Sequence, residues 1–117
     1  MLYNTAGNNE QQQRLFAMNN FQFGECQIQP QHNTILKEGV SMPVCPRVMD
    51  ILLYLVKHHE RVVPADELLD AFWAGPVVEE STIHRHISQI RTALGDSARS
   101  SKYIKTISKR GYQKVRF

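Results

Sequence analysis

The chain lacks long apolar runs, so no segment of about eighteen apolar residues could span a membrane. Its first residues also lack the charged start and apolar core of a signal peptide. Cysteine is scarce: the only two are Cys26 and Cys45. Two cysteines are too few for a disulfide framework or a zinc site, and we expect both to be reduced thiols.

Signatures of catalysis are missing as well. The sequence has no glycine-rich phosphate loop, no paired-carboxylate motif and no set of metal-ligand spacings. Cys45 has no adjacent His or acid of a recognisable nucleophile motif. His84 and His86 stand two apart on a predicted helix, about 200° around its axis, so they cannot share a metal ion. We therefore predict that the protein is not an enzyme and needs no cofactor or metal.

Charge is unevenly distributed along the 117 residues, whose formal net charge is +3. Residues 1–78 carry five Lys/Arg and eight Asp/Glu, a net of −3, whereas residues 79–117 carry nine and three, a net of +6. Such asymmetry indicates that one surface meets a polyanion while the rest stays solvated. A basic surface without a partner is the alternative. Membrane headgroups fit less well, because no long exposed apolar face opposes the basic residues.

The length is that of one small domain. Residues 1–20 are rich in Asn and Gln and predict a flexible polar tail, followed by a folded domain over residues 21–117. Alternating apolar residues predict one strand near the start of this domain, with a slip at Gly24-Glu25. The segments Thr34–Lys37 and Ser41–Val44 then flank a turn signal, which predicts a small antiparallel sheet.

Three helices follow. Pro46 is expected as the first residue of a helix that reaches about His59, and Pro64 opens a second helix that Gly75-Pro76 would end. A third is predicted from Glu80 to Leu94, before Gly95, with Ser81 or Thr82 capping its first amides. Its buried stripe has spacings of four, three and four, at Ile83, Ile87, Ile90 and Leu94.

The opposite side of the third helix is polar and basic, with Arg85, Ser88, Gln89, Arg91 and Thr92 and no acidic residue among them. A major groove accepts such a face, because a guanidinium binds phosphate or guanine and an amide binds adenine. Segments Tyr103–Ile107 and Tyr112–Phe117 predict a hairpin. The order is therefore sheet, three helices and hairpin, an α+β fold, and we interpret it as a DNA-binding module.

Several motifs together resemble the effector domain of the OmpR/PhoB-type winged-helix transcription factors. They are Arg61-Val62-Val63, Glu67 to Trp73, Thr82-Ile83 through Leu94-Gly95, Tyr103 to Ile107 and Arg110-Gly111-Tyr112. The run from Leu94 to Arg99 with Lys102-Tyr103-Ile104 is most similar to the ToxR/CadC-like branch. That branch implies the cytoplasmic DNA-binding domain of a membrane-anchored regulator, whose membrane-spanning segment would lie beyond this chain.

The resemblance implies a winged helix-turn-helix with residues 81–94 in the major groove of promoter or operator DNA and the wing, residues 103–117, on the backbone and minor groove. It assigns base contacts to Arg85 and Gln89 and phosphate contacts to Thr82, His86 and Arg91. Further DNA-binding positions are implied at Trp73, Ser81, Ser88, Thr92, Thr106, Ser108, Lys109, Arg110 and Tyr112. It also implies RNA polymerase contact through loop 74–80 and dimeric or tandem binding on DNA.

The recognition helix departs from this family pattern. Many members have Arg or Lys where this chain has Ser88, Gln89, Thr92 and Ala93, so we expect fewer phosphate contacts and a weaker dependence on salt. The same departure leaves open a winged-helix protein–protein interaction module that has lost DNA binding. Cys45 and Pro64 replace helix-capping hydroxyls, a loss of about 1 kcal/mol each.

Overall fold

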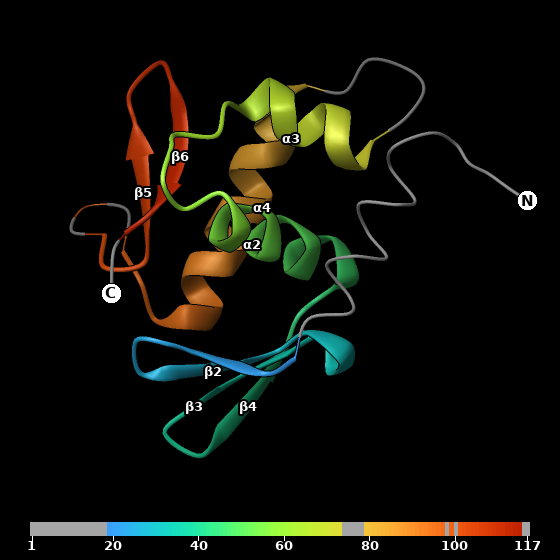
Figure 1. Ribbon diagram of the computed structural model, residues 1–117, viewed down its shortest axis with the longest axis vertical. Helices are drawn as coiled ribbons and strands as arrows, with labels where there is room; N and C mark the ends of the chain where they lie inside the picture. Colours follow the sequence, from blue (N-terminus) through green and yellow to red (C-terminus); the bar gives the residue numbers. More distant parts are fainter. Residues whose placement is uncertain (1–18, 74–78, 98, 100, 116–117) are drawn as a thin grey trace, which may run out of the picture.

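The computed structural model describes residues 19–73, 79–97, 99 and 101–115. A four-stranded sheet lies at one end of the molecule, three helices form its middle, and a hairpin stands beside them (Figure 1). This is the winged-helix α+β arrangement expected from the sequence. Most of the predicted polar tail lies outside the described residues.

The sheet is a meander of four short antiparallel strands, in the order β1-β2-β3-β4. Its strands are β1 (Phe21–Phe23), β2 (Cys26–Gln29), β3 (Thr34–Lys37) and β4 (Val40–Pro43), with a 3-10 turn at Pro30–His32 after β2. The prediction of a single strand at the start was wrong. Gly24 adopts φ +61, which turns the chain back so that Phe23 pairs with Cys26.

The central helix is α2 (Pro46–Lys57), in which every residue from 48 to 55 is buried. A helix that is buried on all sides must be covered by several neighbours. Here α4 (Glu80–Leu94), α3 (Ala65–Phe72) and the hairpin all contact it (Figure 1). Pro46 is its first residue, as expected.

The observed ends of α3 and α4 differ from the predicted ones in three details. Pro64 precedes α3 as its N-cap rather than opening the helix, and α3 ends at Phe72, upstream of the predicted stop at Gly75-Pro76, which lies outside the described residues. Neither Ser81 nor Thr82 caps α4: the N-cap is Glu79, whose carboxylate accepts a 3.4 Å hydrogen bond from Ser81. Gly95 ends α4 in the left-handed conformation, as predicted.

The hairpin consists of β5 (Ile104–Ile107) and β6 (Gly111–Lys114). Both strands are shorter than predicted, and β6 begins one residue earlier because Gly111 pairs with Ile107. At Gly111 φ is +143, and a Cβ there would lie 2.2 Å from the carbonyl oxygen of Val63, so only glycine fits this close approach.

Both cysteines are free thiols, Cys26 buried and Cys45 exposed. Within the described ranges, no helix combines the length and the apolar composition that crossing a bilayer requires.

Candidate nucleic-acid interface

Helix α4 presents one polar stripe to solvent. Exposed polar side chains lie along one side of the helix at Ser81, Arg85, Ser88, Gln89 and Thr92, which we call the α4 stripe. Ile83, Ile87, Ile90 and Leu94 are fully buried on the other side. The stripe carries one cation, one amide and three hydroxyls. It therefore offers several hydrogen-bond donors and acceptors and no negative charge.

Hollows flank the α4 stripe on both sides. A groove of about 400 Å³ separates it from the link between β4 and α2, and Arg85, Gln89 and Thr92 line its helix wall. A second hollow, of about 330 Å³, lies between the amino-terminal half of α4 and the hairpin. Because it stands between two hollows, the stripe forms a ridge that can enter a groove in a partner.

Arg91 differs from its polar neighbours, since only 9% of it is exposed. Its Nε and Nη2 donate to the carbonyl oxygen of Ile104 at 3.1 and 2.8 Å, and Nη2 also donates to the Thr106 hydroxyl at 2.7 Å. The guanidinium thus ties α4 to β5. The sequence placed Arg91 on the exposed polar side of the helix, and this was wrong, because its guanidinium is buried against β5. The phosphate contact expected of Arg91 stays a prediction.

Tyr112 supplies two further links between the hairpin and the helices. Its backbone exchanges hydrogen bonds of 2.7 and 2.9 Å with Val63, ahead of α3, so that Val63 extends the hairpin as a short third strand. Its hydroxyl and Nδ1 of His84 are joined by a 2.7 Å hydrogen bond. Tyr112 is only 2% exposed, and this burial raises the pKa of its hydroxyl.

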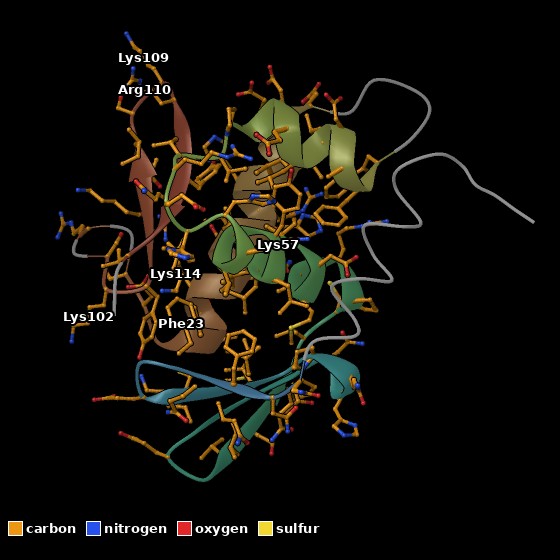
Figure 2. All side chains as sticks on the ribbon, viewed as in Figure 1. Phe23, Lys57, Lys102, Lys109, Arg110 and Lys114 are labelled. Atoms are coloured by element: carbon orange, nitrogen blue, oxygen red, sulfur yellow. The ribbon has the colours of Figure 1, made fainter. Side chains whose placement is uncertain are left out.

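The tip of the hairpin, by contrast, projects into solvent. Ser108, Lys109 and Arg110 are all exposed, and Figure 2 shows the two cationic side chains at the end of the hairpin, beyond the helices. Thr106, on β5, is exposed as well. The hairpin, which hydrogen bonds fix to the helices, therefore carries two positive charges at its tip.

Trp73 is half-buried at the carboxyl end of α3, where its backbone N–H donates to the Leu69 carbonyl at 2.9 Å. Its ring meets His86 of α4 edge to face, with 5.2 Å between the centroids. Nδ1 of His86 in turn donates to the Thr82 carbonyl at 2.7 Å. Trp73, Thr82 and His86 thus form one connected group beside the α4 stripe.

Asp96 organises the connection between α4 and the hairpin, a role that the sequence did not suggest. Its carboxylate accepts backbone hydrogen bonds from Lys102, Tyr103 and Ile104 at 2.7, 3.1 and 2.9 Å. Burial alone would raise the pKa of this carboxyl, but the hydrogen bonds outweigh it and lower the pKa. In the sequence, only the position of an Asp shortly before an irregular segment could have indicated this role of Asp96.

In the parts of the chain that the structure describes, no three His, Cys, Asp or Glu side chains gather closely enough to hold a metal ion. Loop 74–80, predicted to contact RNA polymerase, lies mostly outside those parts.

Comparison with known proteins adds independent information. Residues 39–114 match the family described as "Transcriptional regulatory protein, C terminal". The chain is similar to the transcriptional activator CadC of Escherichia coli, with 34% identity over 91 residues that make up 77% of this chain and 18% of CadC. The chain therefore spans about a fifth of that relative.

Solved structures agree with this similarity. The DNA-binding domain of E. coli CadC superimposes with a TM-score of 0.70 at 32% identity, over 80% of this chain and 89% of that domain. The Thermotoga maritima response regulator DrrB, described as an OmpR/PhoB homologue, superimposes with a TM-score of 0.75 at 27% identity, over 93% of this chain and 50% of DrrB.

Proposed function

Because the chain belongs to the family of transcriptional regulatory protein C-terminal domains, we propose that it binds double-stranded DNA as the effector domain of a bacterial transcriptional regulator. The observation that carries this proposal is the α4 stripe, an acid-free ridge held rigidly beside a cationic hairpin tip. An α-helix of fifteen residues extends about 22 Å, enough to cross a major groove about 12 Å wide.

Each part of the surface has a proposed task. Arg85 and Gln89 read bases from the middle of the α4 stripe, where a guanidinium pairs with guanine and an amide with adenine. Lys109 and Arg110 contact the backbone or the adjacent minor groove from the hairpin tip. Trp73, Thr82 and His86 contact phosphates. Arg91 also supports the phosphate surface, from its position between α4 and β5.

The remaining contacts proposed from the family are weaker and orient the domain. Ser81, Ser88 and Thr92 on the α4 stripe, with Thr106, Ser108 and Tyr112 on the hairpin, contribute hydroxyls near the DNA backbone. The Tyr112 hydroxyl is already bonded to His84, and the Thr92 hydroxyl donates to the Ser88 carbonyl at 3.0 Å. The Thr92 hydroxyl has thereby used its single O–H and can only accept a further hydrogen bond. The Tyr112 hydroxyl either donates to His84 or accepts from it, according to the tautomer of His84.

Proposals about the whole protein rest on its relatives. The match covers 18% of the transcriptional activator CadC. From the ToxR/CadC-like resemblance we propose that this chain is part of a longer, membrane-anchored regulator. From the same family resemblance we propose that two copies bind a repeated operator. We also propose that loop 74–80 contacts RNA polymerase.

The test is fluorescence anisotropy with a labelled mixed-sequence duplex at about 50 and 200 mM salt. Affinity should fall as salt rises, though less steeply than for family members with more cations on the recognition helix. Lys109→Ala should weaken binding and reduce the salt slope by about one unit, whereas Lys57→Ala should not. Lys57 is a matched control because it is also an exposed lysine and lies well apart from the hairpin tip (Figure 2).

Absence of binding at low salt, from protein shown to be folded, would contradict the proposal. It would favour the protein-interaction module instead. Equal losses from Lys109→Ala and Lys57→Ala would mean that binding depends on net charge alone and not on this surface.

A further inference from the structure

Arg47 occupies an unfavourable place in its own helix. It is the second residue of α2, next to the amino-terminal end, where the helix dipole is positive and disfavours a cation. An acidic residue would suit this position, and α2 has none in its first turn. Contacts outside the helix backbone must therefore hold the Arg47 guanidinium where it is.

One of these contacts is Asp50, one turn further along α2. Its Oδ2 lies 3.5 Å from Nη1 of Arg47, and Asp50 is only 3% exposed. Within the described residues, Nη1 of Arg47 and Oδ1 of Asp50 are buried without a hydrogen-bond partner. The pair is thus an electrostatic contact between a buried carboxylate and a guanidinium whose side chain is 32% exposed, and not a hydrogen-bonded bridge.

The other contacts are aromatic. The guanidinium carbon lies 4.9 Å from the ring centroid of Trp73 and 5.7 Å from that of Phe72, both within the range of a cation–π interaction. Trp73 therefore contacts both Arg47 of α2 and His86 of α4, whose ring meets it edge to face. Three helices thus contribute to fixing one indole.

We propose that Arg47 is a positioning residue for Trp73, with Asp50 as its anchor, so that the indole is fixed for DNA contact before DNA arrives. This inference rests on the proposed function and assigns a role to two residues that do not themselves contact DNA in it. The physical reason is that Trp73 lies beyond the last turn of α3, with extended backbone at φ −124 and ψ 125. Helix geometry does not orient its side chain, and the guanidinium over its ring does.

A direct test uses the free protein. Trp73 is the only tryptophan in the chain, so the near-ultraviolet circular dichroism of indole and its quenching by acrylamide report on this one side chain. Arg47→Ala should abolish the dichroism band and increase quenching. Lys57→Ala, which removes one positive charge from the other end of the same helix, should change neither.

Charge and stacking are separated by Arg47→Lys. Lysine keeps the charge but lacks the planar group that lies against a ring. We expect the Arg47→Lys variant to resemble Arg47→Ala in both indole signals. Full recovery of both signals would show that charge alone is sufficient and would overturn positioning by the guanidinium plane.

Binding to the mixed-sequence duplex completes the test through a double-mutant cycle. Arg47→Ala should weaken binding about two- to fivefold, the range expected from an exposed cation–π contact. Trp73→Phe removes the indole N–H, and in that background Arg47→Ala should cost nothing more. An equal loss in both backgrounds would mean that Arg47 binds phosphate on its own, and the positioning role would be wrong.

Failure of the two proposals can be told apart. If the parent protein binds no duplex, the proposed function fails, yet the indole signals of the free protein still decide whether Arg47 holds Trp73. If the duplex binds but Arg47→Ala leaves those signals unchanged in folded protein, only the positioning role is overturned. A Trp73→Phe variant with parental affinity would overturn it as well, because a positioned indole would then serve no contact.

Discussion

Arg91 of α4 and Ile104 of β5 are joined by two hydrogen bonds from one guanidinium to one carbonyl oxygen, at 3.1 and 2.8 Å. The two residues are 13 positions apart in the sequence, and the contact between them is almost fully buried. It connects the helix proposed to read bases with the hairpin proposed to grip the backbone. We infer that the two elements meet DNA as one rigid unit.

Arg91→Ala should therefore affect both stability and binding. Removing the guanidinium leaves the Ile104 carbonyl unsatisfied, and we expect a loss of about 1–3 kcal/mol in the free energy of unfolding. Urea unfolding measures this loss. Binding should weaken by a similar factor on every duplex, because no base contact is removed. A variant of unchanged stability would show that the buried bonds add nothing.

Gln89→Ala and Arg85→Ala should behave differently, because both side chains are exposed on the α4 stripe. We expect little change in unfolding free energy and a loss of about 1–3 kcal/mol of discrimination at one base pair each. Selection of preferred sites from a random duplex library, repeated with each variant, measures this. If Gln89→Ala reduced affinity for random DNA as much as for the selected site, base reading by Gln89 would be wrong.

Asp96→Asn should destabilise the protein near neutral pH by about 1–3 kcal/mol, because three backbone N–H groups lose a charged acceptor. The pKa of Asp96 is lower in the folded than in the unfolded state, so its contribution is present above the unfolded pKa and is lost as pH falls through the folded pKa. Thermal melts of parent and variant should diverge near neutral pH and converge in acid. A constant difference across pH would contradict this.

Asp50→Asn should have the opposite pH dependence. Burial raises the pKa of Asp50 to about 6, although Arg47 opposes the shift. The folded state then retains a proton that the unfolded state has already lost, so stability falls by about 3 kcal/mol as pH rises from about 4 to 6. The variant should lack this fall, which urea unfolding across that range detects. Parallel curves for parent and variant would mean that Asp50 titrates normally.

Local patterns in the sequence were sufficient for the order of elements and for α4. The spacing of Ile83, Ile87, Ile90 and Leu94 predicted its buried side because a helix repeats every 3.6 residues whatever surrounds it. Gly95 marked its end for an equally local reason, since left-handed backbone favours glycine. The first two strands were harder to predict, because one irregular strand and a tight hairpin give the same alternation of apolar residues. The positive φ of Gly24, which turns the chain back, distinguishes the hairpin.

The sequence by itself thus determined that three helices precede a hairpin and that one helix exposes an acid-free polar side. Only the tertiary structure decided that Arg91 turns into the hairpin, that Asp96 holds the connection to it, and that Arg47 lies on Trp73. Helical periodicity places a residue on a side of its helix, but it carries no information about which distant segment covers that side. The Asp96 contacts join residues six to eight positions apart, the Arg91 contact joins residues 13 apart, and the Arg47 contact joins residues 26 apart. All of them exist only once the core has brought the elements together.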